Sequence, residues 1–156
     1  MSRTGGCQCG AVRFRVEGEL GRASICHCRM CQKAFGAFYG PYVSAHKKDV
    51  AWTRGAPKYF QSSNRVKRGF CGDCGTQLTF EGDWASVDFA IGAFDDPRDI
   101  KPVIQIGLEA KLPWLDELAD LPGRPPKEAE GMVGYYETIV SHQHPDHDTD
   151  DWTPKT

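Results

Sequence analysis

Seven cysteines carry the most informative chemistry in this 156-residue sequence, and they fall into three groups. A central group lies within six residues, in the spacing Cys-x-Cys-x-x-Cys, and consists of Cys26, Cys28 and Cys31. The other four form two pairs, which are Cys7 with Cys9 and Cys71 with Cys74. Tetrahedral zinc takes four ligands in a closed structural site, and three in a reactive site with an open position. The sequence therefore predicts one site of each kind.

The cellular compartment decides how these thiols are interpreted. The sequence starts without the apolar core of a signal peptide, so we expect a cytoplasmic protein. Reducing cytoplasm disfavours disulfides, and a secreted disulfide scaffold more often has an even number of cysteines. Clustered thiols are then best explained by zinc. Buried apolar thiols and a redox-active pair remain as alternative interpretations.

Composition excludes several other classes of protein. The length suits one domain with its own core, and 40% of the residues are hydrophobic. The sequence contains no run of 18 apolar residues, so no membrane association is expected. A net charge of −2 argues against a nucleic-acid-binding protein, which would usually be basic.

Predicted strands and turns position the cysteines. Val12, Phe14 and Val16 alternate with arginines, which indicates a half-buried strand directly after the first pair. A short strand at 23–25 is expected to deliver Cys26, and further strands are expected at 42–46, 49–53, 58–63, 77–80, 85–91 and 103–108. Glycines in the 71–76 segment permit left-handed backbone, so that both of its thiols can face one ion. The segment 32–40 is expected to be a loop or a broken helical turn.

Other segments allow both a bland and a functional interpretation. Phe35, Phe38 and Tyr39 could line a pocket near the central cysteines, although core packing is the commoner role. The basic stretch 65–68 could be a solvated face or a grip on substrate carboxylates. A short helix at 112–121 could pack on the sheet edge, and 133–140 could add one more element. The His- and Asp-rich segment 141–151 could bind a metal, but a solvated tail is expected.

Three motifs together resemble the glutathione-dependent formaldehyde-activating enzyme family, also called the centromere protein V family. They are Gly6-Cys7-Gln8-Cys9-Gly10, the run from Cys26 to Lys33, and Phe70-Cys71-Gly72-Asp73-Cys74-Gly75-Thr76. The segments 91–97 and 113–114 are also similar, and the resemblance covers roughly residues 5–122. The sequence departs from the family at Gln105, where a histidine often stands.

The resemblance implies a mainly β fold, in which a small zinc-bound antiparallel β-sheet domain called the β-tent spans residues 1–122. Residues 123–156 would be a C-terminal extension that packs on this domain or trails from it. The family's structural zinc site maps onto Cys7, Cys9, Cys71 and Cys74, in agreement with the ligand count. Its reactive site maps onto Cys26, Cys28 and Cys31, and this site could be only partly occupied by zinc.

The chemistry implied for the reactive site is carbon–sulfur bond formation and cleavage. A thiol such as glutathione would take the open position as a thiolate and add to formaldehyde, and the reverse step defines a lyase. The cysteines would act only as ligands, and the sequence offers no clear general base. The protein could instead carry the adduct, or be a zinc-stabilised binding module. The latter predicts a fourth protein ligand at the central cysteines, with His27 and His46 as candidates, although His27 is expected to point away from the metal.

Overall fold

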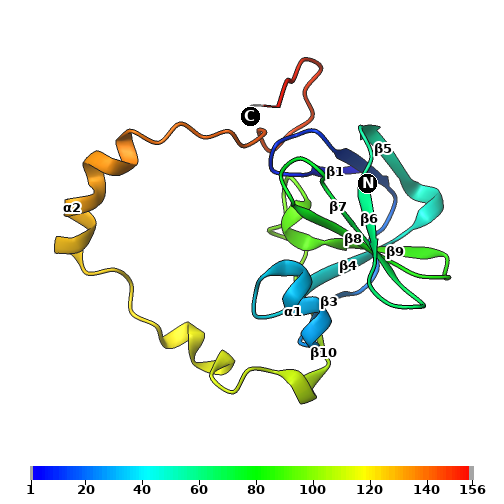
Figure 1. Ribbon diagram of the computed structural model, residues 1–156, viewed down its shortest axis with the longest axis horizontal. Coiled ribbons are helices and arrows are strands. Elements are labelled where there is room, and N and C mark those ends of the chain that lie inside the picture. The colour runs from blue at the N-terminus through cyan, green and yellow to red at the C-terminus, as the bar shows by residue number, and fades with distance from the viewer. Residues whose placement is uncertain (1, 155–156) are drawn as a thin grey trace.

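The fold is built from ten strands in two sheets, as described for residues 2–154 in a computed structural model (Figure 1). A three-stranded antiparallel sheet has the order β1-β2-β5, formed by Ser2–Gly6, Arg13–Glu17 and Val50–Arg54. A seven-stranded sheet has the order β10-β3-β4-β9-β8-β7-β6. Its strands, in the same order, are Ile104–Ile106, Ala23–Cys26, Gly40–His46, Ser86–Ala90, Gln77–Glu81, Lys67–Phe70 and Lys58–Gln61. The expected mainly β fold is confirmed.

The core lies between the two sheets. Phe14 of β2 is fully buried, and its ring centroid lies 4.3 Å from that of Phe89 in β9. Phe94, which follows the short 3₁₀ helix Ile91–Ala93, packs edge-on against Phe14 at 5.2 Å. A single bridge between Gly5 and Phe94 also joins the β1 edge to this segment. Aromatic side chains from both sheets therefore hold the sheets together.

All strand pairs are antiparallel except that of β10 with β3. The expected strand at 103–108 is present but shorter. It lies at the edge of the seven-stranded sheet, where its Ile106 is 49% exposed. The strands expected at 42–46, 49–53, 77–80 and 85–91 correspond to β4, β5, β8 and β9. Two strands were not foreseen. One is β1, and the other is β7, which contains Lys67 and Arg68 of the basic stretch.

Helical structure is sparse and mostly peripheral. Helix α1, Arg29–Phe35, begins inside the central cysteine motif, where a loop or broken turn was expected from residue 32. Short 3₁₀ helices occupy Lys47–Asp49, Leu108–Ala110 and Leu115–Asp120. Trp114, just before the last of these, packs edge-on against Phe38 at 4.9 Å. No helix within residues 2–154 is long and apolar enough to cross a membrane.

The C-terminal part of the chain leaves the sheets and then returns to them (Figure 1). Helix α2, Pro126–Glu137, has no buried residue and lies apart from the two sheets (Figure 1). Residues 144–152, which we name the C-terminal strap, then bind the loop between β1 and β2. His144 donates its backbone N–H to the Gln8 carbonyl at 2.7 Å, and the Trp152 indole donates to the Cys9 carbonyl at 2.7 Å.

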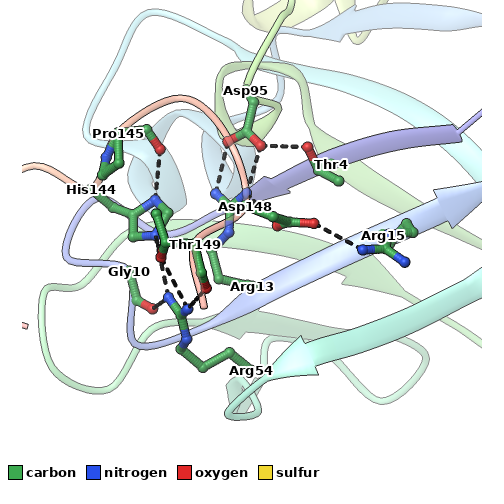
Figure 2. Close-up of polar contacts among 10 residues, drawn as sticks. All are labelled: Thr4, Gly10, Arg13, Arg15, Arg54, Asp95, His144, Pro145, Asp148 and Thr149. Atoms are coloured by element: carbon green, nitrogen blue, oxygen red, sulfur yellow. Dashed lines mark hydrogen bonds and ion pairs between the residues drawn. The ribbon is translucent and has the colours of Figure 1, made fainter. Parts of the chain in front are cut away.

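Charged contacts reinforce this anchoring (Figure 2). Asp148 accepts hydrogen bonds from Arg13 at 2.8 Å and from Arg15 at 3.0 Å. Arg54 of β5 donates to the Thr149 carbonyl and hydroxyl groups. The expectation of a solvated tail is therefore wrong for the strap, in which His144 is 3% exposed. No His or Asp of the strap joins a metal-ligating group among the described residues.

Candidate metal centres

Two distant turns bring Cys7, Cys9, Cys71 and Cys74 together, and we call them the four-cysteine cluster. Their sulfur atoms all lie within 4.8 Å of one another. The Sγ atom of Cys9 lies 3.6 Å from that of Cys7 and 3.8 Å from that of Cys71. Four sulfurs around zinc at bonds of about 2.3 Å would be about 3.8 Å apart, whereas a disulfide needs about 2.05 Å. The spacing therefore fits a tetrahedral metal site.

Each turn is shaped by its own backbone. Gly10 and Gly75 both have a φ of 77°, in the left-handed region that glycine enters at little cost. The Gly10 N–H donates to the Cys7 carbonyl at 3.1 Å, and the Gly75 N–H donates to the Cys71 carbonyl at 3.0 Å. Thr76 joins the two turns, because its hydroxyl accepts from the Gln8 N–H at 3.0 Å. Two similar turns therefore face each other across one cluster.

The surroundings of the four-cysteine cluster are buried and rich in backbone donors. Three of its thiols, those of Cys7, Cys9 and Cys71, are buried. The Val12 N–H donates to the Cys7 sulfur at 3.2 Å, and the Asp73 N–H donates to the Cys71 sulfur at 3.4 Å. Such bonds stabilise thiolates without any side-chain cation. The arrangement is compatible with a closed metal site of four thiolates.

The central motif forms a second cluster, which we call the three-cysteine cluster. Cys26 ends β3, Cys28 caps the N-terminus of α1, and Cys31 lies in its first turn. Their sulfurs lie within 4.8 Å of one another, and Cys26 and Cys28 are partly exposed. The Cys31 N–H donates to the Cys28 sulfur at 3.4 Å. Helix α1 forms here because this capping bond satisfies a backbone donor that a loop would leave to water.

No fourth His, Cys, Asp or Glu in the described chain completes the three-cysteine cluster. His27 is fully buried, and its Nε2 lies 2.9 Å from Oε1 of Gln105 in β10, to which its N–H donates. His46 is exposed at the far end of β4. Neither histidine joins the cluster, as expected for His27. Gln105 is the partner that holds this ring.

Cys26 and Cys28 differ in the direction of their pKa shifts, which bears on whether the cluster suits a cation. Burial raises the pKa of Cys26 to about 12. For Cys28 burial also acts upward, but hydrogen bonds from the Cys31 N–H and from neighbouring thiols, with the charge of Arg68, bring its pKa below the usual value. One thiolate is thus favoured and a second is disfavoured. A divalent cation would remove this conflict, because thiols deprotonate when they bind metal.

Three residues that the sequence analysis did not single out support the three-cysteine cluster. The Gln32 amide donates to the backbone carbonyl groups of His27 at 2.5 Å and Ala110 at 2.9 Å, and so holds the motif against the Leu108–Ala110 turn. Arg68 donates to the Cys31 sulfur at 3.5 Å, and the Tyr42 hydroxyl lies 3.9 Å from the same sulfur. Only the basic character of stretch 65–68 offered a signal, and it did not point to Cys31.

A cavity of about 640 Å³ lies beside this cluster, between α1 and strands β6 and β7. Arg68 connects the two, because it lines the cavity and contacts the Cys31 sulfur. The cavity walls are Arg29, Met30, Lys33, Ala34, Phe60, Ser62, Arg68, Phe70, Gly75 and Gln77. The aromatic walls are thus Phe60 and Phe70 rather than residues 35, 38 and 39.

Comparison with known proteins agrees with this geometry. The sequence profile of the family described as "Glutathione-dependent formaldehyde-activating enzyme" matches residues 2–109, which is more than half of the chain. The chain belongs to this family. The matched segment contains both cysteine clusters and ends before α2. The family assignment made from the three motifs is confirmed.

Two individual proteins are also similar to this chain. A Schizosaccharomyces pombe protein named as an uncharacterized lyase is 32% identical over 76 residues, which are 49% of this chain and 55% of the yeast protein. The match thus spans little more than half of the length of that relative. A crystal structure of a Rhodobacter sphaeroides protein aligns with a TM-score of 0.54 and 25% identity, over 65% of this chain and 98% of that one. The β-sheet fold of this chain is therefore also found in a solved structure.

Proposed function

We propose that this protein is a zinc-dependent carbon–sulfur lyase, in which a thiol such as glutathione binds at the three-cysteine cluster and adds to an aldehyde such as formaldehyde. The observation that carries the proposal is the convergence of three thiols with no fourth ligating side chain in residues 2–154. Zinc held there would keep one position for a substrate thiol and favour its deprotonated form. The family and the lyase name of the yeast relative support this reaction class.

The residues around the cavity suit a thiol that carries carboxylates. Arg29 and Lys33 of α1 line the cavity, and both are positively charged. Met30, Phe60 and Phe70 supply apolar surface that would exclude water from the substrate. Glutathione, with two carboxylates and one thiol, would match this combination of charges. In this proposal the basic grip comes from α1, since Lys67 instead pairs with Glu81 at 3.5 Å.

The reaction needs little acid–base help from the protein. The substrate thiol releases its proton to solvent when it becomes a thiolate. Its sulfur lone pair then forms a bond to the carbonyl carbon, the carbon–oxygen π electrons move to oxygen, and that oxygen takes a proton from water. Cys26, Cys28 and Cys31 act as ligands rather than as nucleophiles. Of the residues that line the cavity, none carries a carboxylate or an imidazole. This favours one alternative, in which the protein carries the thiol adduct without accelerating its formation.

We also propose that residues 1–122 form the zinc domain and that residues 123–156 are an extension of it, acting in the cytoplasm. The family match ends at residue 109, which supports this division. All seven cysteines are free, and a reducing compartment would keep them so.

Zinc-edge X-ray absorption of the zinc-loaded protein tests the proposal. Glutathione should add one sulfur to the zinc of the three-cysteine cluster, which raises the sulfur count averaged over the two zinc ions by about one half. S-methylglutathione, which lacks a free thiol, should add none. An unchanged sulfur count with glutathione would contradict the proposal. NMR exchange spectroscopy then separates lyase from carrier, because only a lyase speeds the exchange between glutathione, formaldehyde and their adduct.

A further inference from the structure

Arg68 is a buried cation with an unusual set of partners. It lies in β7, is 3% exposed, and its guanidinium sits 4.9 Å from the centroid of the Phe80 ring. Its Nη1 donates to the Tyr42 hydroxyl at 2.6 Å, and its Nε donates to the Ser62 hydroxyl at 3.2 Å. Its Nη2 donates to the Cys31 sulfur at 3.5 Å. Each nitrogen therefore has a partner, but none of these partners is a carboxylate.

A buried guanidinium without a counter-charge is costly, so the missing negative charge must come from nearby. Among the described ion pairs, none includes Arg68. The thiol of Cys31 is in direct contact with Arg68, and thiols bind a metal ion as thiolates. Three thiolates around one divalent cation carry one net negative charge. Arg68 would neutralise that charge.

The four-cysteine cluster provides an internal contrast. Its sulfurs accept hydrogen bonds from backbone N–H groups, such as those of Val12 and Asp73, and contact the Thr76 hydroxyl. No cationic side chain donates to any of its sulfurs in the described chain. A cation is therefore not a general requirement for clustered thiols in this fold. It is present only where an additional anionic ligand would have to enter.

We propose that Arg68, together with Tyr42, is a positioning residue that holds the Cys31 sulfur and offsets the negative charge of the three-cysteine cluster, so that the cluster accepts a substrate thiolate. This inference rests on the proposed function for its last step. Without Arg68, a fourth thiolate would enter a site that already carries a net negative charge. With Arg68, the entering sulfur meets a neutral assembly.

The test compares Arg68→Met with Lys67→Met, which removes the same charge from the neighbouring position in β7. Zinc affinity of each cluster is measured by chelator competition on the full chain, and glutathione affinity by titration of the Co²⁺-substituted protein. Hydrogen bonds to charged groups suggest that Arg68→Met weakens both zinc and glutathione binding at the three-cysteine cluster by about tenfold or more. The four-cysteine cluster and Lys67→Met should be unchanged.

Arg68→Lys is the second variant, and it keeps the proposal falsifiable if Arg68→Met does not fold. It should retain zinc, because the charge remains. It should shift the sulfur-to-Co²⁺ charge-transfer bands, because an ammonium cannot reproduce the bonds to Cys31, Tyr42 and Ser62 together. Unchanged bands with unchanged glutathione affinity would overturn the proposal, as would an Arg68→Met protein with wild-type affinities.

The two proposals fail in different ways. If wild-type protein binds zinc but no thiol, the proposed function fails, while a loss of zinc affinity in Arg68→Met would still show that Arg68 supports the cluster. If wild type and Arg68→Met bind glutathione and zinc equally well, the role of Arg68 fails and the proposed function stands.

Discussion

The two cysteine clusters both consist of thiols, but they differ in sequence separation, in burial and in the groups that donate hydrogen bonds to their sulfur atoms. The four-cysteine cluster joins turns that are more than 60 residues apart, and its donors are backbone N–H groups. The three-cysteine cluster is contained in one short motif at the start of α1, and a side-chain cation supports it. The first cluster is mostly buried, whereas the second is partly exposed beside a cavity. Sequence separation and burial suit a site that maintains the fold, while locality and exposure suit a site that exchanges ligands.

The C-terminal strap sharpens this difference, because it binds only beside the four-cysteine cluster. Its Trp152 indole donates to the Cys9 carbonyl, and the backbone N–H of His144 donates to the Gln8 carbonyl. Figure 2 shows the polar contacts of His144, Asp148 and Thr149 in the strap. The strap therefore fixes the Cys7–Gly10 turn from outside. No corresponding segment covers the cavity beside the three-cysteine cluster, as far as residues 2–154 show.

The largest effect is expected for Cys71→Ser. This change removes one of four ligands from the cluster that ties the β1–β2 turn to the β7–β8 turn. Zinc binding in small structural sites contributes on the order of 10 kcal/mol to folding. We expect insoluble or unfolded protein, measured by yield and thermal unfolding. A soluble variant with the wild-type melting temperature would show that the four-cysteine cluster does not maintain the fold.

Cys28→Ser should be far milder. The three ligands of its cluster lie within six residues, so a bound metal closes only a local loop and adds little long-range constraint. We expect a nearly normal melting temperature, a loss of one zinc equivalent by emission spectroscopy, and loss of thiol binding. Unfolding as severe as in Cys71→Ser would make both clusters structural.

The sequence predicted both clusters because their motifs are short and because ligand number alone pairs the two outer turns. It also predicted the strands that alternate in hydrophobicity, such as that around Phe14. It could not predict the partners of Arg68, since the contact with Cys31 depends on the placement of β7 37 residues away. A basic stretch gives no apolar periodicity, so β7 itself was missed.

The anchoring of the strap was equally hidden from the sequence. Asp148 and Arg13 are 135 residues apart, and an Asp-rich terminal segment is compositionally typical of a solvated tail. Helix α1 was missed for a related reason: glycines at 36 and 40 indicate a break, and the capping by Cys28 becomes visible only in three dimensions.

Asp148→Asn tests whether the strap stabilises the four-cysteine side of the molecule. Asp148 accepts charge-assisted bonds from two arginines, and Arg13 is 3% exposed. Because Asp148 itself is partly exposed, we expect a loss of about 1 kcal/mol in the free energy of unfolding. Asp150→Asn is the matched control, since Asp150 makes no described contact. Equal unfolding curves for both variants would show that the charged contacts of Asp148 add no stability.

The smallest effect concerns pH and His144, which faces charged groups of several elements. Its Nδ1 lies 2.6 Å from the Pro145 carbonyl and therefore carries the proton, and its Nε2 lies 3.2 Å from Arg54 Nη1, from which it accepts. Burial lowers the pKa of His144, and the charges of Arg13 and Arg54 lower it further, while the Pro145 carbonyl and Asp95 act in the opposite direction. The neutral ring is thus the form that fits the strap.

A lowered pKa in the folded state means that the unfolded chain binds the proton first as pH falls. The contribution of His144 is therefore complete above an unfolded pKa of about 6.5 and declines as pH drops from there towards the folded pKa. The indole N–H signal of Trp152, assigned with Trp152→Phe, should report loosening of the strap in this range by NMR. His144→Gln cannot become charged, so its Trp152 signal should lose this pH dependence. The same dependence in His144→Gln would assign the effect to another group, such as the thiols beneath the strap.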